Sequence, residues 1–114
     1  MLVEDEMIIA LDMENTLTEL GHDVTWVASV NEAARLADGG GFDLAIIDHH
    51  LKDGDSDEVA MKLRQAGIPF VVCSGRGGLQ ELGDVFAGTP FLQKPYTTDG
   101  LIEALSAVTK ATVN

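Results

Sequence analysis

Five polar residues of the sequence are of the types that phosphoryl transfer requires: Glu4, Asp5, Asp48, Ser74 and Lys94. Asp5 and Asp48, with Glu4 behind them, offer the hard oxygen ligands that Mg²⁺ prefers. Asp48 can act as a nucleophile toward a phosphoryl group and form an acyl phosphate. Ser74 and Lys94 would lie on either side of the transferred group, the hydroxyl donating to one oxygen and the ammonium neutralising another. This chemistry requires a fold that brings distant parts of the chain to one place.

Each of these residues lies in or next to the end of a short apolar run. Runs of this length, rich in aliphatic and aromatic side chains, are typical of buried parallel strands. Strands are expected at 1–3, 23–28, 42–48, 68–73 and 89–93, the second of them from its β-branched and aromatic residues. Asp48 is the last residue of the run 42–48, so its carboxylate is expected at the exit of a strand.

Helical patterns fill the segments between the strands, and local signals mark several of their ends. Ser29 and Glu32 form a capping-box pattern, and Gly21 and Gly67 are expected to end two helices. The segment 79–86 is short and bounded by glycines, so its helix is expected to be the least stable. Helices are predicted at 7–20, 29–37, 57–66, 79–86 and 98–110. Their apolar faces include Ile9, Met13, Leu17 and Leu20 in the first helix, and Leu101, Leu105 and Val108 in the last.

The alternation of strands and helices indicates an α/β domain, with right-handed crossovers around a parallel sheet that is covered on both faces. No internal repeat or linker divides the sequence, so residues 1–114 are expected to form a single domain without an effector domain. In open sheets of this type, ligands bind outside the carboxyl ends of the strands, where the strand order reverses. The candidate site is therefore the edge at which the strands end.

Composition argues against several classes of function. The 7 basic and 19 acidic residues give a net charge of −12, which repels a phosphate backbone, so no nucleic-acid partner is expected. The single cysteine, Cys73, lies in an apolar run and cannot form an internal disulfide, which suits a reduced, cytoplasmic protein. No apolar stretch approaches the roughly 20 residues that span a bilayer, so no membrane partner is expected.

The ordered set of residues resembles the receiver domains of two-component response regulators. The resemblance covers essentially the whole chain and rests on Val3-Glu4-Asp5-Glu6, Asp48, Ser74-Gly75 and Lys94-Pro95. The short spacing between these motifs is similar to that of stand-alone alphaproteobacterial receivers. The resemblance implies a flavodoxin-like (βα)5 doubly wound sandwich, with a five-stranded parallel sheet in the order 2-1-3-4-5.

The resemblance also implies how the acidic residues act. Asp48 would accept a phosphoryl group from a histidine kinase or a histidine phosphotransfer protein, in phosphorelay signal transduction. Asp5 would ligate Mg²⁺ directly, and Glu4 would act through water. The backbone carbonyl of His50 would complete the protein's share of the metal site, with Asp48 as a further ligand.

On the far side of the phosphoryl group, the resemblance assigns its oxygens to Ser74 and Lys94. Ser74 and Phe91 fall at the positions of the family's conformational switch, although the sequence alone does not separate a switch from a core role for Phe91. The Lys94–Pro95 peptide bond is cis in similar proteins. The output would be a protein surface, read by a downstream partner that the sequence does not identify, and the receiver would be a monomer or a weak homodimer.

Three departures from the family pattern bear on the site. Lys52 stands where most relatives have a proline, which predicts a looser loop after the phosphoacceptor. The distances along the chain from Asp48 to Ser74 and from Ser74 to Lys94 are short, which predicts trimmed third and fourth helices. Arg76 stands where the similar short receivers carry an aromatic residue.

Two other functions compete with the receiver. A phosphatase of the haloacid-dehalogenase type also uses a strand-end aspartate, but it requires a second aspartate two residues later, where this chain has His50. A degenerate receiver that serves only as a binding module is disfavoured by the intact Asp48, Lys94 and acidic pair. The protein is therefore expected not to be an enzyme beyond its own phosphorylation and dephosphorylation.

The adjacent His49 and His50 suggest zinc as a further possibility. Neighbouring side chains on an extended segment point to opposite faces, and no cysteine or further histidine cluster completes a tetrahedral site. The two histidines are therefore expected to be loop residues rather than metal ligands.

Overall fold

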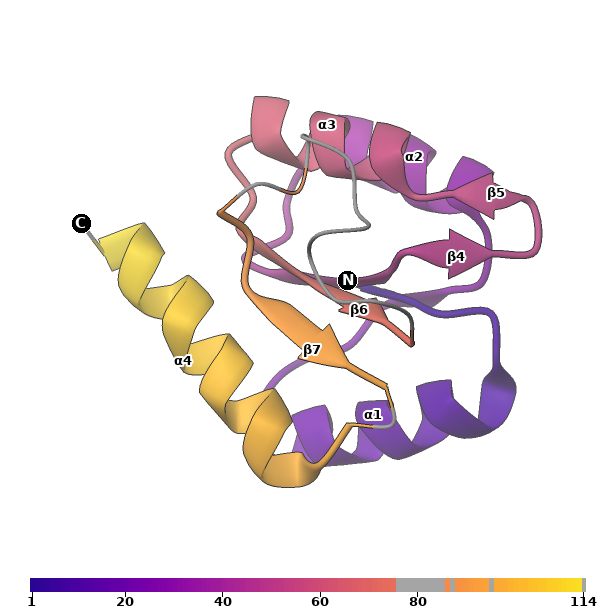
Figure 1. Ribbon diagram of the computed structural model, residues 1–114. Helices are drawn as coiled ribbons and strands as arrows, with labels where there is room; N and C mark the ends of the chain where they lie inside the picture. Colours follow the sequence, from indigo (N-terminus) through magenta and orange to yellow (C-terminus); the bar gives the residue numbers. More distant parts are fainter. Residues whose placement is uncertain (76–85, 87, 95, 114) are drawn as a thin grey trace.

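A five-stranded parallel sheet forms the centre of the protein (Figure 1). The computed structural model describes residues 1–75, 86, 88–94 and 96–113. The strands of this sheet are β1 (Leu2–Val3), β2 (Trp26–Val27), β3 (Ala45–Asp48), β6 (Phe70–Ser74) and β7 (Phe91–Gln93). Their order, β2-β1-β3-β6-β7, is the predicted order 2-1-3-4-5 when these five strands are counted along the chain. The flavodoxin-like α/β fold is thus confirmed.

Helices cover both faces of the sheet. The helices α1 (Met7–Glu19) and α4 (Thr98–Val113) lie on one face, and α2 (Val30–Gly39) and α3 (Asp57–Gln65) lie together on the other (Figure 1). The predicted helix 79–86 falls outside the described residues, apart from the buried Phe86. None of the described helices is long and apolar enough to cross a membrane.

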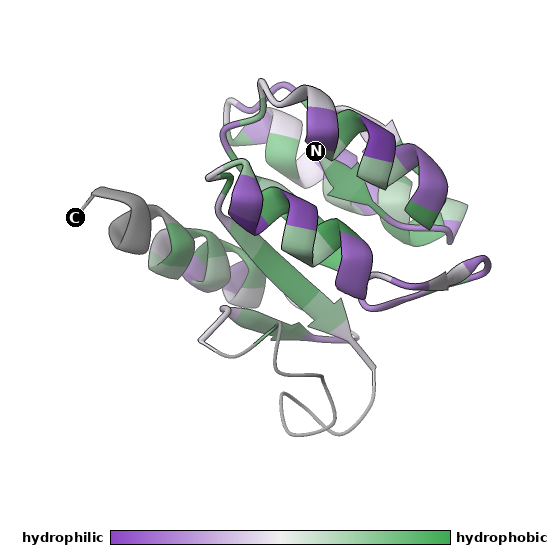
Figure 2. Ribbon diagram, turned by 90° about the horizontal axis from the view of Figure 1, so that it is seen from above, coloured by the Kyte–Doolittle hydropathy of each residue, from purple (hydrophilic) through white to green (hydrophobic). Residues whose placement is uncertain are grey.

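Successive residues of each central strand enter two separate cores. Because side chains alternate across a strand, one set packs under α1 and α4 and the next set packs under α2 and α3. The first core includes Leu2, Ile46, Val71 and Cys73 with Ala10, Met13, Leu101 and Leu105. The second includes Val3, Ile47 and Val72 with Ala33, Ala37, Val59 and Leu63. In Figure 2 the central strands are accordingly largely green, whereas purple and green alternate along the helices.

The structure confirms the predicted capping residues at the start of one helix and after the ends of two others. Ser29 is the N-cap of α2, and its hydroxyl accepts a hydrogen bond from the Glu32 backbone N–H at 3.2 Å. Gly21 and Gly67 follow the C-caps of α1 and α3 with φ of 96° and 73°, a left-handed conformation that costs glycine little. These signals end the helices close to the predicted residues.

Two expectations about these elements are wrong. Leu20 is 46% exposed rather than part of the buried face of α1, because the helix ends at Glu19 and Leu20 is its C-cap. The segment after Asp48, expected to be a polar loop, contains a two-stranded antiparallel hairpin of β4 (His50–Leu51) and β5 (Gly54–Asp55).

Candidate active site

The carboxyl ends of the central strands bring most of the candidate residues to one edge of the sheet. Asp48 is the last residue of β3, and Ser74 is the last residue of β6, one residue beyond the predicted end of that strand. Glu4 directly follows β1, and Lys94 directly follows β7. The Lys94 backbone N–H donates to the Ser74 carbonyl at 2.9 Å, which extends the pairing of β6 with β7 to this edge.

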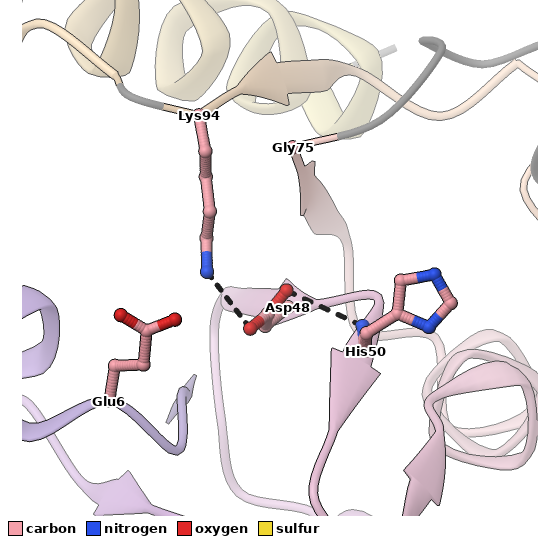
Figure 3. Close-up of a pocket in the computed structure, with 5 residues that line it drawn as sticks. All are labelled: Glu6, Asp48, His50, Gly75 and Lys94. Atoms are coloured by element: carbon pink, nitrogen blue, oxygen red, sulfur yellow. Dashed lines mark hydrogen bonds and ion pairs between the residues drawn. The ribbon is translucent and has the colours of Figure 1, made fainter.

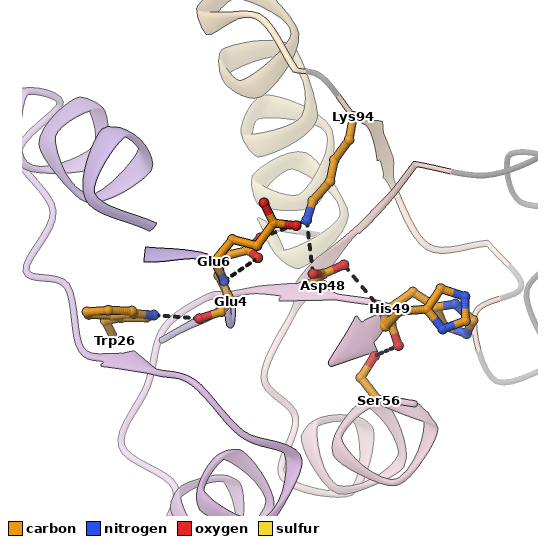
Figure 4. Close-up of polar contacts among 8 residues, drawn as sticks. Glu4, Glu6, Trp26, Asp48, His49, Ser56 and Lys94 are labelled. Carbon is orange, nitrogen blue, oxygen red and sulfur yellow. Dashed lines mark hydrogen bonds and ion pairs between the residues drawn. The ribbon is translucent and has the colours of Figure 1, made fainter. Parts of the chain in front are cut away.

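The Lys94 ammonium connects the two acidic strand exits (Figure 4). Lys94 Nζ donates to Glu4 Oε2 and to Asp48 Oδ2, both at 2.9 Å. The Glu4 and Asp48 side chains are only 2% and 7% exposed, and that of Lys94 is 16% exposed. Two carboxylates with so little solvent require a compensating charge, and Lys94 supplies one positive charge for the two.

Burial and neighbouring charges have opposing effects on the pKa values of Glu4 and Lys94. Burial raises the pKa of the Glu4 carboxyl above its usual value, and the charge of Asp48 adds to the rise, against the hydrogen bond from Lys94. Burial alone would lower the pKa of Lys94, but the hydrogen bonds to Glu4 and Asp48 outweigh it and the pKa is raised overall. Lys94 is therefore protonated at neutral pH, and its single positive charge faces two acidic side chains.

The start of α1 adds two more acids to this edge. Oxygens of Glu4, Asp5 and Glu6 all lie within 4.8 Å of one another. The Glu6 backbone N–H donates to Glu4 Oε1 at 3.1 Å, and the Trp26 indole N–H donates to the Glu4 carbonyl at 2.7 Å. The bond from Glu6, the N-cap of α1, orients the Glu4 carboxylate, and the bond from Trp26 in β2 holds the Glu4 backbone.

A pocket opens directly beside Asp48 (Figure 3). Its lining residues are Glu6, Asp48, His50, Gly75 and Lys94. Glu6 was not among the residues predicted for the site, although its place in a run of three acids is visible in the sequence. Asp5 is half-buried in the acid cluster next to the pocket, and Ser74 is 2% exposed at the end of β6.

The two histidines after Asp48 do not point to opposite faces, as an extended segment would require. Their ring centroids lie 4.3 Å apart with an edge-to-face orientation. The reason is that His49 lies in a bend between β3 and β4, where the chain changes direction, so the period of two does not apply. The prediction that they cannot share a metal is therefore wrong in its geometric premise.

His50 contributes its main chain to the pocket, and its ring lies elsewhere. The His50 backbone N–H lies 3.4 Å from Asp48 Oδ1, while His50 Nδ1 lies 2.6 Å from Asp55 Oδ1. Figure 3 shows the imidazole pointing away from the Asp48 carboxylate. A ring in this position does not provide the acid or base that the phosphatase alternative requires next to the nucleophile.

The hairpin that follows is tied to α2 despite the absence of the family's proline. Asp53, in the turn after Lys52, accepts hydrogen bonds from the backbone N–H groups of Val30 and Asn31 at 2.9 and 3.3 Å. These are first-turn N–H groups of α2, which have no partner within the helix. The loop expected to be looser is thus fixed by a side chain that caps a helix distant in sequence.

Of the remaining residues singled out in the sequence, the structure describes Phe91 but neither Arg76 nor Pro95. Phe91 begins β7 and is partly buried against the core under α2 and α3. The Lys94–Pro95 bond and Arg76 involve residues outside the described ranges. Ser74 and Phe91 therefore keep the switch role only as a prediction.

The amino-acid sequence matches the family model of the response regulator receiver domain over residues 1–106. The chain belongs to the receiver-domain family. Receiver domains belong to two-component response regulators, generally bind Mg²⁺ in an acidic pocket and interact with histidine kinases and downstream effectors. The acidic edge described above lies at the place in this receiver where such a pocket is expected.

Solved receivers and curated regulators are similar to this receiver over nearly its whole length. A response regulator receiver protein from Sinorhizobium medicae is 33% identical with a TM-score of 0.82, covering 97% of this chain and 93% of that chain. SdrG from Sphingomonas melonis is 39% identical with a TM-score of 0.80, covering 95% and 92%. The swarming motility regulation protein RssB of Serratia marcescens is 30% identical over 96% of this chain and 52% of its own length. The transcriptional regulatory protein TcrA of Mycobacterium tuberculosis is 31% identical, over 96% and 45%. The chain thus spans about half the length of the curated relatives that it matches.

Proposed function

We propose that this receiver accepts a phosphoryl group on Asp48 from a histidine kinase or a histidine phosphotransfer protein. The observation that carries the proposal is the position of Lys94 Nζ, 2.9 Å from Asp48 Oδ2 and 2.9 Å from Glu4 Oε2, in a pocket that Lys94 and Asp48 both line. A buried strand-end carboxylate with a lysine beside it and an open side toward solvent provides a nucleophile, a charge to stabilise the product and a path for the donor.

The residues present fit a bound Mg²⁺. Glu4 lies among acids that outnumber the single ammonium of Lys94, and burial, with a smaller contribution from the charge of Asp48, raises its pKa. Asp5 and Asp48 would ligate the ion, with Glu4 acting through water and the His50 carbonyl completing the set. When bound, Mg²⁺ supplies positive charge to the phosphoryl oxygens and relieves the repulsion among the carboxylates.

In the transfer step, an Asp48 carboxylate oxygen attacks the phosphorus of the donor phosphohistidine. The new P–O bond forms as the P–N bond breaks, and the imidazole leaves with the bonding electron pair. Lys94 turns from the free carboxylate to a phosphoryl oxygen, and the Ser74 hydroxyl donates to another. The buried carboxylate is thereby replaced by a larger dianionic group, which shifts the balance of charge around Lys94.

The consequence of phosphorylation would be a change in a protein-binding surface. The turn of Lys94 toward the phosphoryl group and the engagement of Ser74 alter the ends of β6 and β7, whose backbones are joined by the bond from Lys94 N–H to the Ser74 carbonyl. Phe91, at the other end of β7, would change its packing in response. The downstream partner would read the face formed by β7 and α4, and the protein would act as a switch, a phosphate shuttle or a phosphate sink.

The test is incubation of the protein with acetyl phosphate and Mg²⁺, followed by intact-mass measurement. The wild type is expected to gain the mass of one phosphoryl group, and Asp48→Asn is expected to gain none. Asp55→Asn, an exposed carboxylate of the neighbouring hairpin, is the matched control and should be phosphorylated like the wild type. A wild-type protein that gains no phosphoryl group, or an Asp48→Asn variant that still does, would overturn the proposal.

The same preparation tests whether the protein is an enzyme toward other substrates. Because the His50 ring points away from Asp48, hydrolysis is expected to be limited to the protein's own acyl phosphate. Turnover of p-nitrophenyl phosphate that is lost in Asp48→Asn would instead support the phosphatase alternative.

A further inference from the structure

A cluster of metal-ligating side chains lies next to the phosphoacceptor pocket and is separate from its acids. One ring nitrogen each of His49 and His50 and a carboxylate oxygen of Asp55 lie within 4.8 Å of one another. His49 comes from the bend after β3, His50 from β4 and Asp55 from β5. The pairing of His50 with Asp55 across the hairpin holds two of these groups in register.

His49 is the buried member of the cluster, and within the described part of the chain its ring lacks the hydrogen bonds that a buried imidazole normally makes. Its side chain is 9% exposed, and Nδ1 is buried without a hydrogen-bond partner among the described residues. Its Nε2 lies 3.5 Å from Asp57 Oδ1, an oxygen that also has no hydrogen-bond partner there. An unpartnered buried imidazole nitrogen is costly in a protein interior and is usually satisfied by a donor, a water or a metal.

The polar groups around His49 match the usual surroundings of a histidine that binds zinc. Such a histidine presents one nitrogen to the metal and directs the other toward a carboxylate or a carbonyl, which fixes the orientation of the ring. Here Nε2 faces the Asp57 carboxylate, at the start of α3, so Nδ1 is the nitrogen left for a metal. The ring is further held edge-to-face by Phe86, with the centroids 5.3 Å apart.

The remaining two ligands are positioned to close on an ion at small cost. His50 Nδ1 and Asp55 Oδ1 lie 2.6 Å apart, and their side chains are 55% and 58% exposed. Two ligands of a tetrahedral zinc with bonds near 2.1 Å are separated by about 3.4 Å. The pair therefore has to open by less than about 1 Å to exchange its shared proton for a metal ion, and exposed side chains of a hairpin can make this movement.

We propose that His49, His50 and Asp55 bind a borderline-soft divalent cation such as Zn²⁺, with a water in the fourth position. Two imidazoles and one carboxylate are a ligand set that favours Zn²⁺ over Mg²⁺, because Mg²⁺ selects oxygen ligands. The site is distinct from the acidic pocket: it takes the ring of His50, whereas Mg²⁺ would take the carbonyl of the same residue. The proposal does not depend on phosphorylation of Asp48.

The experiment is isothermal titration of the metal-free protein with ZnCl₂ in a buffer that contains excess Mg²⁺. The wild type is expected to bind one Zn²⁺ per chain. His50→Gln and Asp55→Asn are each expected to weaken Zn²⁺ binding by about tenfold or more, since each removes one ligand. Both residues are exposed, so the variants are expected to fold, which circular dichroism checks.

Two control variants separate this site from other sources of binding. His22→Gln changes the remaining histidine, which is exposed at the end of α1, and should bind Zn²⁺ like the wild type. Asp5→Asn changes the acidic pocket and should also retain Zn²⁺ binding. Absence of Zn²⁺ binding to the wild type, unchanged affinity in His50→Gln and Asp55→Asn, or loss of binding in Asp5→Asn would each overturn the proposal.

Discussion

The Lys94 ammonium lies 2.9 Å from the Asp48 carboxylate and connects the exits of two strands that are not neighbours in the sheet. Between β3 and β7 lies β6, so the lysine side chain reaches over the end of one strand to meet Asp48. Glu4, from β1 on the other side of β3, meets the same ammonium. One cation thus joins three strand ends, and the stability of the site depends on it.

Replacement of Lys94 by alanine should destabilise the fold markedly. The change leaves the Glu4 and Asp48 carboxylates buried without their cation, and removal of one partner of a buried ion pair typically costs roughly 3 kcal/mol. Urea unfolding at neutral pH measures the loss. The deficit should shrink in acid, because the uncompensated carboxylates take up protons and then no longer repel each other.

Lys52→Ala is the matched control for this variant. Lys52 is an exposed lysine in the hairpin turn, and its removal should change the free energy of unfolding by less than about 0.5 kcal/mol. Equal effects of the two substitutions would show that the Lys94 contacts add nothing to stability.

Mg²⁺ should stabilise the folded protein through the acidic pocket. At a free Mg²⁺ concentration ten times the dissociation constant, mass action adds about 1.4 kcal/mol to the free energy of unfolding. For a chain of this size the melting temperature should rise by about 5 °C. Differential scanning calorimetry with and without MgCl₂, at constant ionic strength, measures the shift.

Asp5→Asn tests whether this stabilisation arises at the proposed site. The variant loses a direct ligand while the half-buried position keeps a side chain of the same size. Its melting temperature should not respond to Mg²⁺. A response as large as that of the wild type would place the ion elsewhere.

The Asp53 carboxylate should stabilise the protein in a pH-dependent way. Its hydrogen bonds from the N–H groups of Val30 and Asn31 hold its pKa below the usual aspartate value. A carboxyl with a depressed pKa in the folded state contributes stability that is complete above its unfolded pKa and disappears as the pH falls through its folded pKa. Asp53→Ala should therefore be less stable than the wild type from pH 8 to about pH 5, and the difference should narrow below about pH 4.

Urea unfolding across this pH range, with Asp23→Ala as the control, tests the contribution of the hydrogen bonds between Asp53 and α2. Asp23 is an exposed aspartate outside the hairpin. If the two alanine variants lose stability equally at every pH, the bond between the hairpin and α2 does not hold in solution.

The sequence predicts those parts of the fold that depend on interactions between residues close together along the chain. The strand ending at Asp48 was predictable because β3 is buried on both faces, so its residues form a continuous apolar run. The ends of α1 and α2 were predictable for the same kind of reason, since Gly21 and Ser29 act within one turn. The meeting of four strand exits followed from the alternation of strands and helices, without knowledge of any single contact.

The contacts that the sequence did not predict join segments distant along the chain. The hairpin after β3 depends on Asp53, which binds the backbone of α2 more than 20 residues earlier, with separations of 23 and 22 residues. The rings of His49 and His50 lie close together because of the bend at His49. The backbone of His49 is held there by hydrogen bonds with the backbones of Cys73 and Ser56. A rule for extended chains has no information about such a bend, so it gave the wrong orientation for the two rings.

Cys73 lies beside the acidic site, and its thiol should react very slowly with alkylating reagents in the folded protein. It pairs in register with Asp48, is 2% exposed, and burial raises its pKa to about 12 from an ordinary value of 9.0. At pH 8 this shift lowers the thiolate fraction by about a thousandfold, and the thiolate is the form that reacts. Labelling with iodoacetamide, followed by mass spectrometry, should therefore be at least about a hundredfold slower in the native protein than in the same protein unfolded in urea. Cys73→Ala should not be labelled in either state and identifies the reacting residue. Comparable labelling rates in the native and the unfolded protein would contradict the prediction. They would show that the edge of the sheet near Asp48 opens to solvent far more often than its packing implies.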